Sequence, residues 1–298
     1  MAETIQRVLV TGANKGIGLA AVEEILGHGP QTVVILGSRD RARGAAARDT
    51  LLVEHPDWES RLELLDLDVA DEASVRQARG ELAERFEGLV QPLCGLVNNA
   101  GIGMGADCLA PVLAVNLWGM CQVSDAMRDL LADGGRIVNV TSAAGPNFVN
   151  RCSEALQRRL TDTDASRAEL GGLVTELLAL EGDGEAIEKA GFGDGSAYGF
   201  SKACANLYTL ILAREAPRLR VNACTPGFIE TDLTRPYAVH QGKAPVELGM
   251  KPPLEGTRSI LHLLFAPEPG TGHYFGSDAL RSPLDRYRAP GTAAYDGS

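Results

Sequence analysis

Residues 11–18 read TGANKGIG, and they directly follow the apolar run Ile5–Val10. A short strand that enters a glycine-rich loop and then a helix is typical of a dinucleotide-binding site. Gly12 permits the tight turn that leaves the strand, and Gly16 and Gly18 let the N-terminus of the helix approach a pyrophosphate closely. The spacing is G-x3-G-x-G and not the commoner G-x-G-x-x-G. The residues of this loop that we expect to bind the cofactor are Gly12, Asn14, Lys15, Gly16, Ile17 and Gly18.

Charge and length limit the classes of function. The 298 residues carry a formal net charge of −11, with a sequence pI of about 5.0. Such a surface repels nucleic acid and anionic membranes, so we expect neither as a partner. No apolar run approaches the ~20 residues of a membrane span, and the N-terminus lacks the apolar region of a signal peptide, which favours a cytoplasmic protein. The six cysteines include no C-x-x-C pair, so we expect reduced thiols and no metal site.

Apolar runs alternate with helical patterns along the chain. The candidate strands are Ile5–Val10, Thr32–Leu36, Leu62–Asp66, Leu93–Val97, Arg136–Thr141 and Arg220–Cys224. The candidate helices are Ile17–His28, Arg41–His55, Glu72–Glu87, Leu109–Leu131 and Ala197–Ala213. This alternation predicts an α/β fold, a single-domain Rossmann-type doubly wound parallel sheet over residues 1–298. We expect a helical insertion at residues 146–195, after the fifth strand, and a tail at residues 267–298 that wraps the surface without regular structure.

The corner after the second strand indicates which dinucleotide is bound. An acidic residue usually accepts from the ribose 2′-hydroxyl of NAD there, whereas this chain has Ser38 and Arg39. A hydroxyl and a guanidinium suit the extra phosphate of NADP, and Lys15 and Arg43 could converge on the same phosphate. The alternative is that these basic residues are a solvated helix start. Because positive charge at a helix N-terminus opposes the helix dipole, we favour NADP.

Polar and small residues follow the next strands, where ligands of parallel sheets bind. After the third candidate strand, Asp68 and Val69 place a carboxylate where an adenine amino group could be bonded. After the fourth, the run NNAG places Asn98, Ala100 and Gly101. Small residues there allow close approach to a ribose, and the Asn amides can tie neighbouring strands together. The fifth strand ends in Thr141 and Ser142.

Tyr198 and Lys202 are four residues apart, so they share one face of the predicted helix. A free tyrosine has a pKa of about 10 and transfers protons poorly at neutral pH. A nearby ammonium, together with the positive charge of oxidised nicotinamide, favours the phenolate and brings the pKa of Tyr198 toward the working range. The pair is therefore a candidate for proton transfer.

Together these motifs resemble those of the short-chain dehydrogenases/reductases. The chain shows, in family order, the TGxxxGxG loop, NNAG, Asn116, Ser142, Tyr198-x3-Lys202 and the turn Pro226-Gly227. The resemblance implies that Ser142 orients a substrate carbonyl, Tyr198 donates the proton, and Lys202 holds the ribose and tunes Tyr198. It implies that Asn116 anchors a water of a proton relay, and that Pro226, Gly227, Ile229 and Thr231 also bind the cofactor. Thr141 competes with Ser142 for the serine role, but Ser142 aligns with the second residue of the family's SS pair.

The long segment between Ser142 and Tyr198 resembles the insertion of the carbonyl-reductase group, whose members are mostly NADPH-dependent and monomeric. The resemblance implies reduction of a small-molecule ketone or aldehyde to an alcohol with NADPH. Two departures are visible. Thr225 stands where some members have a second cysteine, and the tail at residues 277–298 matches no family pattern.

Two other functions remain open: a catalytically silent NADP-binding scaffold or sensor, and an alcohol dehydrogenase that works in the oxidative direction. A nucleotide-sugar epimerase is disfavoured by the glycine spacing. We expect the walls of the substrate site after Ser142, in the insertion and after Gly227. The candidate side chains of the last segment are Phe228, Leu233, Tyr237, His240 and Met250.

The insertion also bears on the oligomeric state. The helix predicted at Ala197–Ala213 carries an apolar stripe, Ala203, Leu207, Leu210 and Ile211, that needs a cover. The insertion offers an amphipathic helix with Leu170, Leu173, Val174, Leu177 and Leu178 on one side. If that helix covers the stripe, no surface is left for a two-fold dimer, so we expect a monomer. The alternative is that the insertion is a substrate lid and dimers form.

Overall fold

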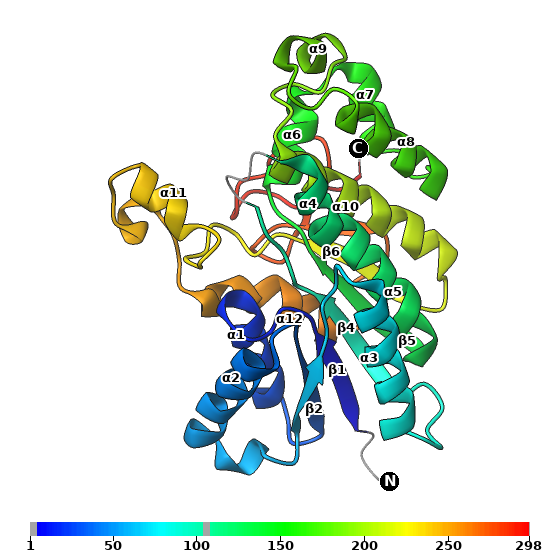
Figure 1. The fold of residues 1–298 in the computed structure, drawn as a ribbon, viewed down its shortest axis with the longest axis vertical. Helices are drawn as coiled ribbons and strands as arrows, with labels where there is room; N and C mark the ends of the chain where they lie inside the picture. The colour runs from blue at the N-terminus through cyan, green and yellow to red at the C-terminus, as the bar shows by residue number, and fades with distance from the viewer. Residues whose placement is uncertain (1–4, 104–107, 298) are drawn as a thin grey trace.

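The computed structural model describes residues 5–103 and 108–297. Its centre is an eight-stranded sheet in the order β3-β2-β1-β4-β5-β6-β7-β8 (Figure 1). Every neighbouring pair is parallel except β7 and β8. The order turns back between β1 and β4, and ligands of such sheets bind beyond the strand ends at this point. The strands are β1 Gln6–Val10, β2 Thr32–Ser38, β3 Leu62–Asp66, β4 Leu93–Asn98, β5 Leu131–Val140, β6 Arg220–Cys224, β7 His273–Phe275 and β8 Arg281–Ser282.

Helices cover both faces of the sheet because the strands are apolar on both sides. Successive residues of β1 belong to different cores: Leu9 packs in one, and Val8 and Val10 pack in the other. The first core holds the buried sides of α3 Glu72–Arg85, α5 Met120–Met127 and α10 Ala197–Glu215. The second holds those of α1 Gly16–Gly27, α2 Arg41–Glu54 and α12 Arg258–Phe265 (Figure 1). The predicted doubly wound α/β fold is confirmed.

The single helix predicted at Leu109–Leu131 is interrupted. The structure has α4 Leu109–Leu113, a π-helical turn η2 Ala114–Gly119, α5, and the 3₁₀ turn η3 Arg128–Leu130. Leu131 already pairs with Leu93 and begins β5. Apolar periodicity continues through the interruption, so the pattern alone could not reveal it.

The insertion is helical, as predicted. It contains α6 Ala144–Arg151, α7 Glu154–Leu160, α8 Arg167–Leu178 and α9 Gly184–Lys189. A capping box between Ser166 and Glu169 starts α8, and α8 packs beside α10 (Figure 1). Its apolar residues Leu170, Leu173, Val174 and Leu177 are buried, while Leu178 is partly exposed.

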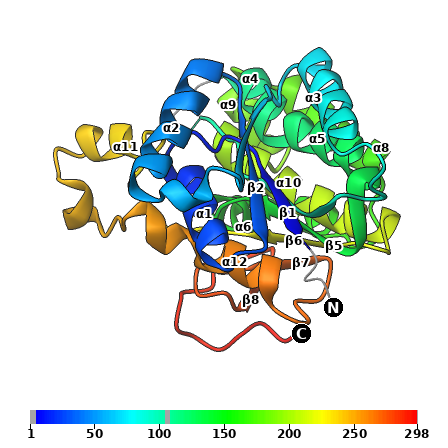
Figure 2. The same ribbon diagram turned by 90° about the horizontal axis from the view of Figure 1, so that it is seen from below.

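The tail contains regular structure that we did not expect. β7 pairs with β6, and β8 pairs back on β7, so residues 267–298 extend the sheet. Two- and three-residue strands are too short to show a period in the sequence. Figure 2 shows the tail, which includes β8, on the flank of the molecule beside α12.

The remaining short elements lie between these units. They are η1 Pro56–Trp58, α11 Arg235–His240, η4 Pro245–Leu248 and η5 Pro253–Thr257. α11 projects away from the body of the molecule in both views (Figures 1 and 2). Among the described residues, none of the helices has the length and apolar character needed to span a membrane.

Candidate active site

The glycine loop has the backbone geometry that the sequence predicted. Gly12 and Gly16 have φ angles of 61° and 57°, in the region that favours glycine. A Cβ atom on Gly12 would lie 2.9 Å from the Cα of Ala100, and one on Gly18 would lie 2.5 Å from Nδ2 of Asn99. Side chains at Gly12 and Gly18 would therefore collide with the residues that follow β4.

Two residues that we did not single out hold this loop in place. The hydroxyl of Thr11 accepts hydrogen bonds from the backbone N–H groups of Asn99 and Ala100, both at 3.0 Å. The Asn99 amide donates to the carbonyls of Thr11 at 2.9 Å and Gly12 at 3.2 Å. The sequence alone does not show whether the amide of Asn99 bonds the glycine loop or a ligand, because the answer depends on how β1 and β4 lie next to each other.

Two cavities border the candidate residues, and the larger, of about 520 Å³, lies beside this loop. That volume is within the range of about 300–1,000 Å³ typical of small-molecule and cofactor sites. The cavity brings together most of the predicted cofactor residues: Gly12, Asn14, Lys15, Gly16, Ile17, Gly18, Arg39, Asp68, Val69, Ala100, Gly101, Tyr198, Lys202, Pro226 and Thr231. The N-terminus of α1 opens into it, and its free N–H groups suit a phosphate.

Five predicted cofactor residues do not line the larger cavity: Ser38, Arg43, Asn98, Gly227 and Ile229. Asn98 is buried, and its amide donates to Oδ1 of Asn139 at 2.8 Å and to Ser124 at 2.9 Å. It thus ties β4 to β5 and α5. Residues that we did not predict also line the cavity, among them Leu67, Ile102, Val115, Glu230, Asp232 and Arg235. Leu67, Ile102 and Val115 are apolar, and Glu230, Asp232 and Arg235 lie beside the residues predicted after β6 but outside that set.

The basic residues at the corner after β2 are placed differently from one another. Arg39 is exposed at the cavity and pairs with no carboxylate of the described chain. Arg43 pairs with Asp40 at 3.3 Å, and Lys15 pairs with Asp232 at 2.7 Å. The Ser38 side chain is buried, with its hydroxyl donating to the Asp40 carbonyl at 2.9 Å. Of the three basic residues, only Arg39 can meet a phosphate without first leaving a carboxylate partner.

The candidate catalytic side chains converge at the ends of β5 and α10. Ser142 follows β5, and its side chain lies close enough to Tyr198, in the first turn of α10, to act toward a lower pKa of that tyrosine. Nζ of Lys202 donates to the Val140 carbonyl at 3.1 Å and lies 5.7 Å from the centre of the Tyr198 ring. Thr141, the competing candidate, is buried, and its hydroxyl donates to the Cys224 carbonyl at 3.3 Å. Ser142 is therefore the hydroxyl that reaches Tyr198.

Burial shifts the pKa values of both Tyr198 and Lys202. It raises the pKa of Tyr198, and the hydrogen bond from Ser142 only partly opposes that rise. Burial also lowers the pKa of Lys202 to about 8. The expected lowering of the Tyr198 pKa is thus absent here, because burial raises that pKa and Lys202 does not offset the rise. The other charge invoked, that of oxidised nicotinamide, belongs to the bound state.

Asn116 lies in the π-helical turn η2 and is fully buried. Its carbonyl oxygen accepts from the Ile102 N–H at 2.9 Å, and its amide donates to the Ile102 carbonyl and the Ser201 hydroxyl, both at 3.0 Å. Ser201 in turn donates to the Tyr198 carbonyl at 2.8 Å. Asn116 is therefore connected to the backbone of Tyr198 and does not line the larger cavity.

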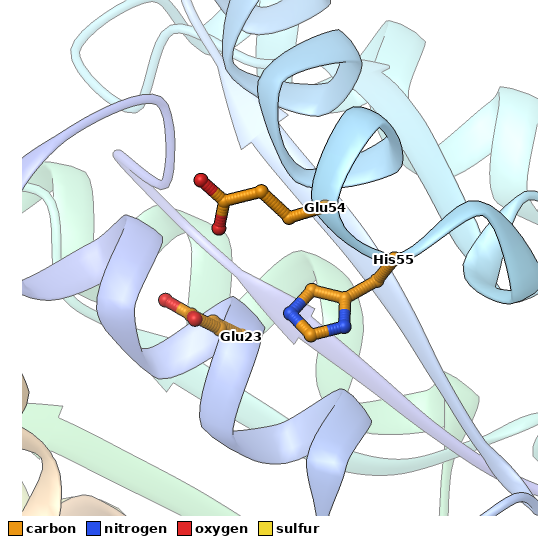
Figure 3. A group of neighbouring side chains, drawn as sticks. All are labelled: Glu23, Glu54 and His55. Carbon is orange, nitrogen blue, oxygen red and sulfur yellow. The ribbon is translucent and has the colours of Figure 1, made fainter.

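The described residues include one set of side chains with metal-ligand spacing, Glu23, Glu54 and His55 (Figure 3). Their ligand atoms lie within 4.8 Å of one another, on α1 and at the end of α2. None of the three lines the larger cavity. The His55 ring stacks on Trp58, with 3.9 Å between ring centres, so packing explains its position.

Comparisons with known proteins identify the class. The family model for short chain dehydrogenase matches residues 6–153. Carbonyl reductase [NADPH] 3 of Rattus norvegicus is 35% identical over 83% of this chain and 88% of its own length. (+)-Neomenthol dehydrogenase of Arabidopsis thaliana is 34% identical over 84% of this chain and 93% of its own. The structure of salutaridine reductase from Papaver somniferum has a TM-score of 0.73 at 26% identity, and the match covers 90% of this chain and 99% of that one. The chain belongs to the short-chain dehydrogenase family.

Proposed function

We propose that this protein reduces a ketone or aldehyde to an alcohol with NADPH. The observation that carries the proposal is the convergence of Ser142, Tyr198 and Lys202. Tyr198 and Lys202 line the larger cavity, Nζ of Lys202 lies 5.7 Å from the centre of the Tyr198 ring, and the Ser142 side chain interacts with Tyr198. The fit of a dinucleotide rests on the glycine loop, which packs too closely on Ala100 and Asn99 for Cβ atoms at Gly12 and Gly18. It rests also on the N-terminus of α1, whose first residues line the larger cavity. Bound NADPH supplies the hydride.

The residues of the chain have separate roles in this proposal. Ser142 donates a hydrogen bond to the substrate carbonyl oxygen and so fixes its position. The Tyr198 hydroxyl gives its proton to the oxygen as negative charge develops there. Lys202 holds the ribose and, as a buried cation, favours the phenolate that Tyr198 leaves behind. Asn116 positions α10 through Ser201 and anchors the water that returns the proton.

The preference for NADPH over NADH rests on Arg39 in our proposal. Its guanidinium lines the larger cavity at the corner after β2 and has no carboxylate partner in the described chain. Lys15 can join it by leaving Asp232, because both members of that pair are exposed. Relatives that carry NADPH in their names share this use of a nicotinamide dinucleotide phosphate.

Among the alternatives, a silent scaffold is disfavoured because Ser142, Tyr198 and Lys202 are all present and in contact. Oxidation of an alcohol uses the same residues in reverse, and the name of one relative is that of a dehydrogenase. We favour reduction because the most similar relatives reported above include a carbonyl reductase. We place the protein in the cytoplasm, since all six cysteines are free.

We further propose that the chain is a monomer. Ala203, Leu207, Leu210 and Ile211 of α10 are buried within the chain, and α8 packs against that helix. Arg167 of α8 reaches both Asp125 of α5 and Glu215 of α10 at 2.6 Å. The apolar stripe that could pair with a second copy is therefore already occupied.

The test is turnover of NADPH by the purified chain with a panel of ketones, aldehydes and quinones. We expect NADPH oxidation with at least one ketone or aldehyde, and its loss in the Tyr198→Phe variant. If NADPH binds but no carbonyl compound is reduced, the scaffold alternative replaces this proposal.

A further inference from the structure

A second, smaller cavity of about 160 Å³ adjoins Ser142 on the side away from the glycine loop. Its walls come from three parts of the chain: the start of α6, the segment after β6 and the tail. Ser142 lines this smaller cavity, whereas its partner Tyr198 lines the larger one. Ser142 and Tyr198, whose side chains interact, therefore connect the two cavities at the place where the reaction of the proposed function occurs.

We propose that the C-terminal tail selects the substrate. On this proposal, which rests on the proposed reduction, the smaller cavity takes an uncharged, ring-sized group attached to the carbonyl. The tail supplies the outer wall through Ser277, Ser282, Arg286, Tyr287, Arg288 and Pro290. Residues 277–298 are the part of the sequence with no family pattern, so the selectivity belongs to this chain.

The tail is fixed by a buried ion pair. Asp278 and Arg288 are bonded to each other, and their side chains are only 11% and 7% exposed. Nε of Arg288 donates to Ser282 at 2.9 Å, and its Nη1 donates to the Thr292 carbonyl at 2.9 Å. The second oxygen of Asp278 accepts from the N–H of Gly291 at 2.9 Å. A surface tail held only by solvent-exposed contacts would not need a guanidinium with all its groups engaged.

The charge of the lining determines the class of ligand. Arg286 and Arg288 are the charged residues of the cavity wall in the described chain. Arg288 is neutralised by Asp278, and Arg286 donates to both oxygens of Asp285 at 3.0 Å. The Arg286–Asp285 pair is about half exposed, so the buried Arg288–Asp278 pair is the one that decides. A substrate carboxylate inside the cavity would have to break that buried pair, whereas an uncharged group would not.

The volume of the smaller cavity determines the size of the substrate group that it can hold. A cavity of about 150 Å³ is large enough for benzene, and this one measures about 160 Å³. Much of its lining is apolar, from Ala143, Pro146, Phe228 and Pro290. One six-membered ring therefore fills the cavity, and a short alkyl group leaves it mostly empty.

Matched substrates test this inference. With NADPH, we compare kcat/KM for acetophenone against 2-butanone, and for benzaldehyde against acetaldehyde. The ring-bearing member of each pair is expected to be favoured by about tenfold or more, the range for apolar pocket contacts. A carboxylate on the ring, as in 4-acetylbenzoate, is expected to lower kcat/KM by at least the same factor. Equal values within either pair, or equal use of the carboxylate, would overturn the inference.

Two variants connect that preference to the tail. Ser277→Leu fills the cavity and is expected to remove the ring preference, and Arg288→Met is expected to do so by releasing the wall. Arg76→Met on α3 is the control for loss of an exposed arginine, with an unchanged preference. If Arg288→Met does not fold, Ser277→Leu decides. A ring preference retained in Ser277→Leu would contradict the role of the tail, whereas no turnover of any carbonyl compound would contradict the proposed function itself.

Discussion

The two cavities that meet at Ser142 and Tyr198 are built from different kinds of structure. The larger cavity is bounded by the ends of parallel strands, a glycine loop, a helix N-terminus, and residues of α10 and of the segment after β6. The smaller cavity is closed by a tail whose position depends on one buried ion pair, Asp278–Arg288. A cofactor is the same molecule throughout a family, so backbone geometry suffices to bind it. A substrate differs from protein to protein, and its wall is made of side chains on a variable segment.

The largest expected effect is on turnover, and it concerns Tyr198, which lines the larger cavity beside Ser142. Tyr198→Phe keeps the ring and removes the proton donor, so we expect turnover to fall by about 10²–10⁴-fold. The Kd for NADPH, measured by fluorescence titration, should stay within about twofold, because the larger cavity is otherwise intact. A Tyr198→Phe variant with turnover within about tenfold of the parent would show that another group donates the proton.

The second prediction concerns the loss of stability caused by burying Lys202 at the larger cavity. Burial lowers its pKa to about 8 in the folded protein, against about 10.4 in an unfolded chain. Below pH 8 the buried ammonium destabilises the fold, and this cost disappears as pH rises from 8 toward 10, so stability gains with pH in that window. Lys202→Met should raise the free energy of unfolding at pH 7 by roughly 2–3 kcal/mol while abolishing activity.

Urea unfolding at pH 7 and pH 10 checks this prediction. The gain from Lys202→Met should be large at pH 7 and small at pH 10. An equal effect at both pH values would mean that the methionine acts through packing and not through the removal of a buried charge. Arg76→Met is the matched control, because it removes an exposed charge from α3.

The contrast between the cavities explains which parts of the molecule could be predicted. The fold, the first six strands and the glycine loop follow from periodicity and from motifs that require a particular backbone. The π-helical turn at Asn116 could not be predicted, because it depends on a contact with Ile102. β7 and β8 were missed because pairing with β6, and not their own pattern, makes them strands. The amide of Asn99 connects β4 to β1, as expected of the NNAG run, whereas the role of the Thr11 hydroxyl required the three-dimensional arrangement.

The third prediction tests the larger cavity at Arg39, which pairs with no carboxylate of the described chain. Arg39→Asp should reduce or reverse the preference for NADPH over NADH, because a guanidinium that can bond the 2′-phosphate is replaced by a repelling carboxylate. A hydrogen bond to a charged group contributes about 1.5–3 kcal/mol, so the ratio of kcat/KM values should change by at least tenfold. Arg43→Asp should change it less, since Arg43 already pairs with Asp40. Equal use of both cofactors by the unmodified protein would contradict the assignment.

The smallest expected effect concerns the insertion that supports the substrate side. Arg167 joins α8 to Asp125 and Glu215, which raises the pKa of its guanidinium, and its side chain is 38% exposed. Partly exposed pairs contribute about 0.2–1 kcal/mol each, so Arg167→Ala should lower the free energy of unfolding by about 1 kcal/mol. Because the buried leucines of α8 still cover α10, the mass in light scattering should remain near 31.5 kDa and kcat/KM should not change. A mass of twice that value, in the parent or in Arg167→Ala, would show that the insertion does not shield the stripe on α10.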